Sequence, residues 1–356
     1  MNDSAALHDL AFSLDLSELA ALRAQFEPIV GPAAQEARRA ALTAAYRDQG
    51  IALVLGAGVS VGVGAPSWTE LMGRLVLGVV GAKLEPGMPI SPLYEPFSRL
   101  LGETLPSDAL VVAHYAKLAL ANRAQPTDEA FIRVLRSALY PPAALAASDL
   151  LAELAAMCSP PEDGAVGVHE VITYNYDEFF EEALVAAGID FQTVDRNERA
   201  RGALPVFHPH GIVRRDPSST GNWVVLAEDE YHRQFAAPHS WSNVVQLNAF
   251  SQMRCCFVGS SMTDPNLRRL LAAAHTGGPP EHFALLRRRS VAGTLRRIAD
   301  AYDGIPAELQ PALRARVQVA CLGGDVADDM TLAALGTQVV WFDEFEELPG
   351  LLRALT

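Results

Sequence analysis

Two short polar motifs carry side chains that could bind or transform a ligand. Asn175 and Asp177 stand two positions apart after an apolar run, and His208 and His210 follow a second, shorter run. An amide and a carboxylate can orient hydroxyl groups or water, and a histidine can act as a general base near neutral pH. Asn and Asp before a helix can equally be its caps. A histidine pair could also bind a metal, but no third ligand has a convincing spacing, so we expect none.

Two turns of small residues also follow apolar runs. The first turn contains Gly56, Ala57, Gly58 and Ser60. The second turn contains Gly259, Ser260 and Ser261. Glycine after a strand lets the backbone approach a pyrophosphate closely, and serines at a strand end can bond a ribose or a phosphate. The first turn could also be a plain connection, because the third glycine and the distant acid of an ordinary dinucleotide fingerprint are not cleanly present.

All four motifs stand where a predicted strand ends. Continuous apolar runs predict strands at 51–55, 168–173, 206–208, 223–226, 254–258, 282–286 and 337–342. Helical patterns, several of them between these runs, cover 68–80, 108–122, 127–139, 143–157, 176–187, 227–233, 240–252, 265–274, 291–302, 307–316 and 346–355. This alternation predicts an α/β fold, a Rossmann-like parallel sheet with helices on both faces. Ligands of such sheets bind at the edge where the strands end.

The chain divides into an N-terminal helical extension and one α/β domain. Residues 1–48 have helical composition, interrupted near Pro28 to Pro32. Residues 49–356 are expected to form the α/β domain. A stretch rich in proline and glycine at 85–107, followed by helical patterns, predicts a helical insertion at about 85–160.

Bulk properties exclude several classes of protein. The net charge is −14, from 42 acidic against 28 basic residues, which disfavours direct binding to nucleic acid. The basic run 287–289 is expected to be a solvated loop edge. The four cysteines form no C-x-x-C pair, so a four-cysteine zinc ribbon cannot be built. No apolar segment is long enough to span a membrane and no secretory signal is present, so we expect a soluble cytoplasmic protein.

Taken together and in this order, the motifs resemble the sirtuin-like family, in its bacterial branch that lacks the zinc ribbon. GAGVSVGVGAPSW is similar to the first NAD loop of that family. TYNYD is similar to its T-x-N-x-D motif, HPHG to its catalytic His-Gly, and VGSSMTDPNLRRLL to the closing stretch of the branch. The resemblance covers about residues 50–356.

The resemblance implies binding roles for the residues that match. The pyrophosphate of NAD would be held by Gly56, Ala57, Gly58 and Ser60. Trp68, the last residue of the same motif, is also a candidate for binding NAD. The adenosine ribose would be contacted by Gly259, Ser260 and Ser261.

The resemblance also implies a catalytic set of three residues. Asn175 would order the nicotinamide ribose and a water molecule. Asp177 would bond the nicotinamide carboxamide, and His210 would be the general base.

Two departures weaken the interpretation as a protein deacylase. Tyr174 replaces the glutamine that deacylases place before the catalytic Asn, and the zinc ribbon is absent. Water is then the natural acceptor of the ADP-ribosyl group. The expected reaction is therefore hydrolysis of NAD+ to nicotinamide and ADP-ribose or a cyclised product. Rival interpretations are a non-catalytic NAD or ADP-ribose sensor that gates a partner, and a protein-lysine deacylase.

Members of this branch are commonly NAD-consuming effectors of bacterial antiviral defence, and the resemblance implies the same here. An unrestrained NAD hydrolase would kill its host, so we expect a homo-oligomer with low basal activity. The helices at 1–48 and 108–157 are candidate contact surfaces. A HerA-like hexameric ATPase is the expected partner, ahead of a short Argonaute.

Overall fold

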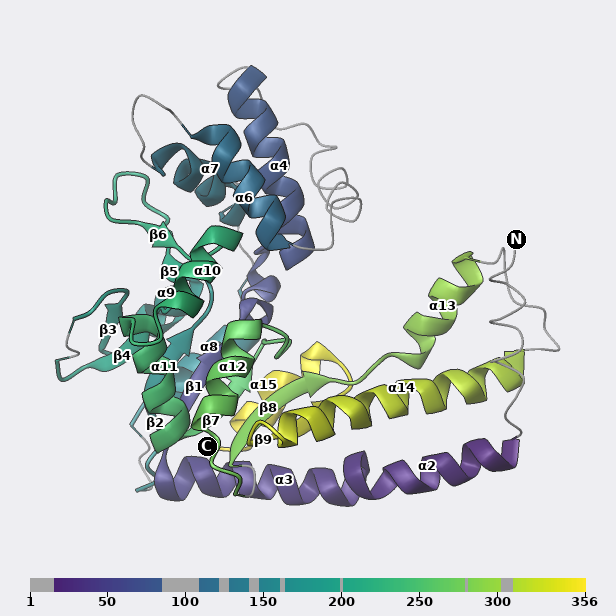
Figure 1. Ribbon diagram of the computed structural model, residues 1–356. Coiled ribbons are helices and arrows are strands. Elements are labelled where there is room, and N and C mark those ends of the chain that lie inside the picture. The colour runs from purple at the N-terminus through teal and green to yellow at the C-terminus, as the bar shows by residue number, and fades with distance from the viewer. Residues whose placement is uncertain are drawn as a thin grey trace.

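The computed structural model contains a seven-stranded parallel sheet between layers of helices (Figure 1). It describes residues 16–84, 109–121, 128–140, 147–160, 164–198, 201–278, 281–301 and 310–356. The expected α/β fold, with a Rossmann-like sheet covered on both faces, is confirmed.

The sheet is built around its most apolar strand. Its strands are β1 (Ile51–Leu55), β2 (Val168–Thr173), β3 (Phe191–Val194), β4 (Leu204–Phe207), β7 (Arg254–Val258), β8 (His282–Arg287) and β9 (Thr337–Phe342), in the order β3-β4-β2-β1-β7-β8-β9. Every residue of β1 is buried, as a continuous apolar run predicts. Leu55 pairs with Thr173 on one side and with Val258 on the other. The loops that follow these three strands therefore emerge side by side.

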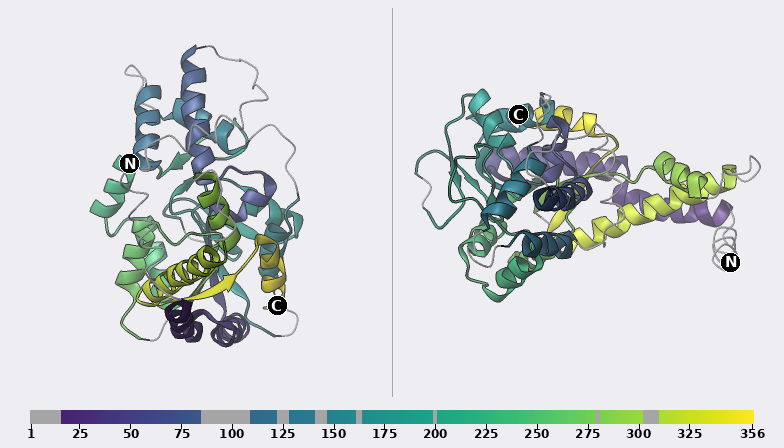
Figure 2. Two further views of the ribbon diagram at one scale, coloured as in Figure 1. Left: turned by 90° about the vertical axis from the view of Figure 1, so that its right-hand side faces the viewer. Right: turned by 90° about the horizontal axis from the view of Figure 1, so that it is seen from above.

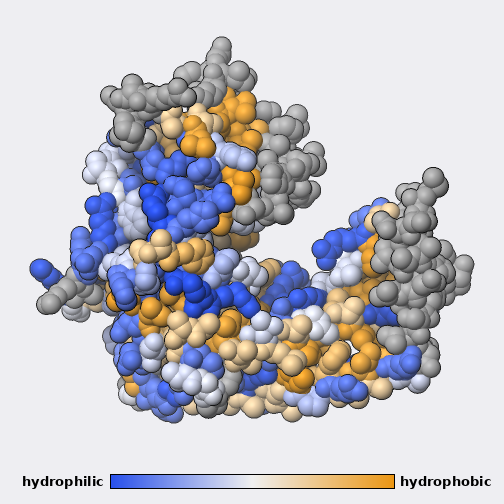
Figure 3. Space-filling view, in the orientation of Figure 1, coloured by the Kyte–Doolittle hydropathy of each residue, from blue (hydrophilic) through white to orange (hydrophobic). Residues whose placement is uncertain are grey.

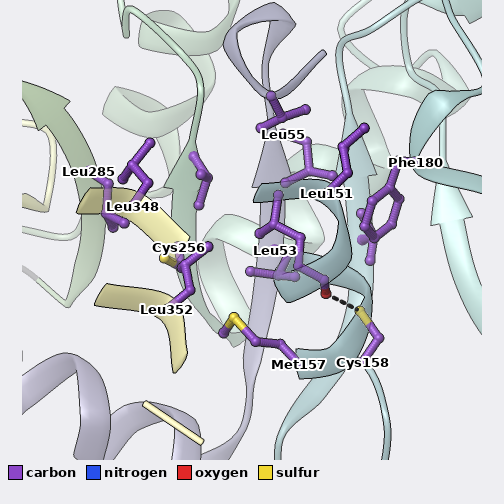
Figure 4. Packing of buried hydrophobic residues seen from close by; sticks show 14 of the residues in the cluster. Leu53, Leu55, Leu151, Met157, Cys158, Phe180, Cys256, Leu285, Leu348 and Leu352 are labelled. Atoms are coloured by element: carbon purple, nitrogen blue, oxygen red, sulfur yellow. Dashed lines mark hydrogen bonds between the residues drawn. The ribbon is translucent and has the colours of Figure 1, made fainter. Parts of the chain in front are cut away.

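Helices cover both faces. They are α2 (Leu16–Val30), α3 (Pro32–Ala44), α4 (Trp68–Leu84), α6 (Ala109–Leu120), α7 (Glu129–Leu139), α8 (Asp149–Met157), α9 (Phe179–Ala186), α10 (Glu228–Ala236), α11 (Trp241–Gln252), α12 (Pro265–Ala274), α13 (Val291–Ala301), α14 (Gln310–Ala333) and α15 (Leu348–Arg353). Leu53 and Leu55 point toward α8, α9 and α15 (Figure 4), whereas Ala52 and Val54 face α11, α12 and α14. This alternation is the two-residue period of a strand with two covered faces.

A helical lobe stands above the carboxyl edge of the sheet (Figure 1, top). It consists of α4, α6 and α7, which share a separate core with Tyr176, Val213 and Val224. Val213 follows β5 (Gly211–Ile212), and Val224 is in β6 (Trp223–Val224), the antiparallel partner of β5. By contrast, α8 packs in the main core, against α9 and α15. The residues at the strand ends thus lie between the sheet and this lobe.

A second projection, the arm, is formed by α2, α13 and α14. Helices α2 and α14 lie side by side, and α13 packs on α14 without burying any residue fully. Figures 1 and 2 show the arm extending away from the sheet. In Figure 3 the surface is hollowed between the lobe and the arm, and apolar residues appear on both.

Several helix predictions were wrong at their ends, and two of them have a clear physical cause. The helix expected at 307–316 continues to Ala333, because Val317, Cys321 and Leu332 form a buried stripe. Gly323 and Gly324 lie inside this helix and do not end it. Position 324 favours a glycine because a Cβ there would lie 2.7 Å from Arg289 Nε. The helix expected from Tyr176 begins only at Phe179, since the preceding residues form the turn that carries the polar motif.

The basic run at 287–289 is neutralised by acids of neighbouring elements. Arg289 pairs with Asp325 and Asp328 at 2.9 and 2.8 Å, and Arg287 pairs with Glu344. The run therefore offers little free positive charge. In the described parts of the chain, no helix has the length and apolar character needed to cross a membrane.

Candidate functional site

The two small-residue turns meet at the carboxyl edge of the sheet. The Gly56 N–H donates to the Val258 carbonyl at 3.0 Å, and the Gly58 N–H donates to the Gly259 carbonyl at 2.8 Å. A Cβ at Gly56 or Gly58 would lie within 2.8 Å of the Gly259 carbonyl oxygen, and Gly259 has φ +70°. Close approach of the turns therefore requires glycine. These amides are already used within the protein, whereas Ala57 is exposed.

Ser60 joins the first turn to the polar motif. Its hydroxyl donates to Asp177 Oδ1 and accepts from Asn175 Nδ2, each at 3.1 Å. All three side chains are buried. The amide nitrogen of Asn175 is thereby engaged, while its Oδ1 is buried without a partner. An unpaired buried acceptor is costly unless a ligand satisfies it.

Asp177 has a structural role as well as a place in the site. Its Oδ1 accepts the Phe179 N–H at 3.2 Å, at the start of α9. Burial raises the pKa of Asp177 to about 6, although the bonds from Phe179 and Ser60 favour the carboxylate. The two interpretations of the N-x-D spacing, as a helix cap and as a functional pair, are thus compatible in one residue.

His210 lies between two tyrosine rings. Its ring centroid is 4.9 Å from that of Tyr174 and 5.6 Å from that of Tyr231, both edge-on. The Tyr231 hydroxyl donates to Asp264 Oδ2 at 2.7 Å, which fixes its ring. Burial lowers the pKa of His210, with Asp264 opposing this shift. The imidazole is therefore neutral near pH 7, and its Nε2 is buried with no partner.

The backbone holds His210 in place through the short pair of strands. Its carbonyl accepts the Val225 N–H at 2.8 Å. The next residue, Gly211, has φ +84°, and a Cβ there would lie 2.0 Å from the Trp223 carbonyl oxygen. Only glycine fits this position, which explains the Gly that follows the histidine.

His208 is separate from the ligand-facing groups. It is fully buried, with Nε2 2.6 Å from Glu181 Oε1 and Nδ1 3.2 Å from the Asn175 carbonyl oxygen. Burial opposes protonation, but Glu181, the Asn175 carbonyl and Asp177 outweigh it and raise the pKa of His208. Both ring nitrogens are occupied, so His208 has none left for a metal. Among the described residues, no three His, Cys, Asp or Glu side chains gather as metal ligands.

The remaining predicted residues, Ser260, Ser261 and Trp68, are partly or largely exposed. Ser261 is exposed and its Oγ is 2.7 Å from Thr263 Oγ1, whereas Ser260 Oγ accepts the Met262 N–H at 3.2 Å. Trp68 is exposed at the start of α4. Its role in binding NAD stays a prediction.

Sequence reasoning missed two residues of the site, Glu181 and Tyr231. Glu181 stands four residues after Asp177, on the first turn of α9, and this spacing could have revealed it. Tyr231 had no such signal, because it comes from α10. That helix is tied to α6 of the lobe by the pairs Lys117–Glu230 and His114–Asp229, the second at 3.2 Å.

Comparison with known proteins agrees with this geometry. Residues 169–305 match the family model of the SIR2-like domain. The match contains Asn175, Asp177, His210 and the second small-residue turn, and it places this segment in a sirtuin-like family. A SIR2-like domain implies NAD binding. The first glycine turn lies outside the match, although Ser60 joins it to Asn175 and Asp177. No curated protein matches the chain.

Proposed function

We propose that this protein hydrolyses NAD+ to nicotinamide and ADP-ribose. The observation that carries the proposal is a pair of buried polar atoms with no partner, Asn175 Oδ1 and His210 Nε2. They belong to one site at the edge where ligands of parallel sheets bind. An acceptor and a neutral imidazole are the groups that would orient and deprotonate a water molecule or a ribose hydroxyl.

The chemistry needs little from the protein beyond orientation. The bond between the ribose carbon and the nicotinamide nitrogen breaks, and its electron pair neutralises the cationic ring. Water forms the new bond to that carbon, and its proton passes to His210. Asn175 would hold the water and the ribose, while Asp177 would accept a bond from the carboxamide. Positioning of this kind supplies a large part of the rate of such reactions.

The surroundings of His210 favour water over a protein substrate. Tyr174 and Tyr231 lie on its ring, and the Tyr174 hydroxyl donates to Gln246. We infer that these anchored rings leave room beside His210 for water rather than for an acyl-lysine chain. This supports hydrolysis rather than deacylation.

The test is to incubate the pure protein with NAD+ and to separate the products by chromatography. Asn175→Ala and His210→Ala should each remove turnover while far-UV circular dichroism shows an intact fold. Ser137→Ala on α7, whose exposed hydroxyl donates to the Arg133 carbonyl, is the control. A correctly folded Asn175 or His210 variant that keeps near-wild-type NAD loss would refute the role given to that residue.

We further propose that the enzyme is a cytoplasmic NAD-depleting effector of anti-phage defence that works as a homo-oligomer. A groove between α2 and α14, lined by Leu19 and Leu322 and also by the charged Arg23 and Glu27, is our candidate for an intermolecular contact on the arm. A partner, a HerA-like ATPase in preference to a short Argonaute, would raise its activity. Light scattering with an NAD assay tests this: a strict monomer with full turnover that no partner changes would contradict it.

A further inference from the structure

We infer that His208 is a positioning residue: it donates to the Asn175 carbonyl and, held by Glu181, fixes the turn that carries Asn175 and Asp177. This inference rests on the proposed function, because it assigns a role in the same site. His208 itself faces no ligand, since both of its ring nitrogens are engaged by protein partners.

The geometry makes His208 a double donor. Nδ1 faces the Asn175 carbonyl oxygen, which can only accept, and Nε2 faces Glu181 Oε1. Three elements that meet at the carboxyl edge are thereby joined: His208 follows β4, Asn175 follows β2, and Glu181 is on the first turn of α9. A bond from a protonated ring to a carbonyl is stronger than one between neutral groups.

The bond acts at the place where the site needs rigidity. The Asn175 side chain is held on one side by Ser60, and its N–H donates to Thr173 Oγ1 at 3.1 Å. The carbonyl of Asn175 is the remaining backbone group of that residue, and His208 fixes it. A turn anchored at the N–H, the carbonyl and the side-chain nitrogen leaves Asn175 Oδ1 pointing in one direction.

His208 and Glu181 also act on Asp177, whose carboxyl accepts hydrogen bonds from the Ser60 hydroxyl and the Phe179 N–H. Glu181 raises the pKa of Asp177 and His208 lowers it; these are smaller effects than burial. Burial raises the pKa of Tyr140, the residue that follows α7, and Asp177 raises it further. Removal of the His208 charge alone would leave Glu181 to act on Asp177 unopposed.

Two substitutions separate the two bonds of His208. The side-chain nitrogen of Asn takes the place of Nδ1, so His208→Asn keeps a donor for the Asn175 carbonyl. The nitrogen of Gln takes the place of Nε2, so His208→Gln keeps a donor for Glu181 only. Both remove the buried positive charge, and both should lower the melting temperature by similar amounts. A merely structural His208 would therefore affect both variants alike.

The expected result is a kcat for His208→Gln at least about 10-fold below that for His208→Asn, with a smaller change in KM. The pH at which activity rises should move upward in both variants. His282→Gln is the control: His282 is also buried, but it starts β8 at the opposite edge, where its Nδ1 accepts the Cys255 N–H at 3.2 Å. That variant should lose stability and keep kcat.

Each outcome decides the inference. If the wild type hydrolyses NAD and the two His208 variants have equal kcat, the inference is overturned and the proposed function stands. If the wild type binds NAD without turnover, the proposed function fails, and the affinities measured by calorimetry decide: weaker binding by His208→Gln than by His208→Asn supports positioning, and equal binding overturns it. A wild type that neither binds nor turns over NAD overturns both.

Discussion

Ser60 donates a hydrogen bond to Asp177 across 117 positions of sequence, at 3.1 Å. Ser60 belongs to the turn after β1, and Asp177 to the turn after β2. Because β1 and β2 are neighbouring parallel strands whose last residues, Leu55 and Thr173, pair, the two turns emerge at the same edge. The glycine turn and the SIR2-like segment therefore build one site.

Replacement of Ser60 by Ala should raise the pKa of Asp177 further above about 6, because the bond from Ser60 favours the carboxylate. If NAD turnover needs ionised Asp177, the rise of activity with pH will move to higher pH. Loss of two buried bonds should also cost about 1–3 kcal/mol of stability. Initial rates between pH 5 and 8 and urea denaturation measure the two effects. An unchanged pH profile in a destabilised variant would show that Ser60 only supports the fold.

Asp177→Asn should abolish turnover, and its stability relative to the wild type should increase as the pH rises. The folded state raises the pKa of Asp177 from 3.8 to about 6, so between these values the folded protein keeps a proton that the unfolded chain releases. Ionisation in this window therefore costs the wild type stability, on the order of 3 kcal/mol by about pH 6.5. The variant does not ionise. Denaturation at pH 4 and pH 6.5 should show the difference moving in its favour; a constant difference would contradict the raised pKa.

The strands that the sequence predicted best are those buried on both faces of the sheet. The strands β1, β2, β7 and β9 begin and end at the predicted residues, because continuous apolar runs leave few alternatives. The edge strand β3 was missed: it has one neighbouring strand, and its sequence FQTV is half polar. The glycines in α14 hid a long helix whose buried stripe only the packed fold reveals.

The site was predictable where strand ends carry it. Asn175, Asp177 and His210 all follow strands of one parallel sheet, and the sheet brings such ends to one edge. Their partners were not predictable. Tyr231 of α10 packs against His210, and Asp264 in the turn before α12 accepts the bond from Tyr231. Such contacts depend on how helices dock, which no local spacing encodes.

Gly211→Ala should destabilise the protein strongly, because it combines a left-handed backbone with a Cβ 2.0 Å from the Trp223 carbonyl oxygen. We expect a loss of several kcal/mol or a failure to fold. Gly188→Ala is the matched control: Gly188 has φ +71°, but nothing lies within 4 Å of its Cβ position. That change should cost only about 1 kcal/mol. Equal melting temperatures for the two variants would show that the contact with Trp223 is unimportant.

NAD turnover should survive prolonged treatment with EDTA. The nitrogens of His208 are occupied by Glu181 and the Asn175 carbonyl, and His210 is enclosed by tyrosine rings. Rates before and after dialysis against the chelator test this. Loss of activity that zinc restores would mean that His208 leaves Glu181 to bind a metal.

Tyr231→Ala should raise the pKa of His210 toward its ordinary value, because burial is the main cause of its lowering. The imidazole would then become protonated at a higher pH, and a protonated ring cannot accept a proton from water. Turnover should fall more at pH 6 than at pH 8. Tyr231→Phe keeps the ring on His210 and loses only the bond to Asp264, so it should change the pKa of His210 much less. Histidine-selective NMR titration of the three proteins measures these values directly. If His210 titrates in the Ala variant as it does in the wild type, Tyr231 does not shield His210 from solvent. The burial that lowers the pKa of His210 must then come from other residues.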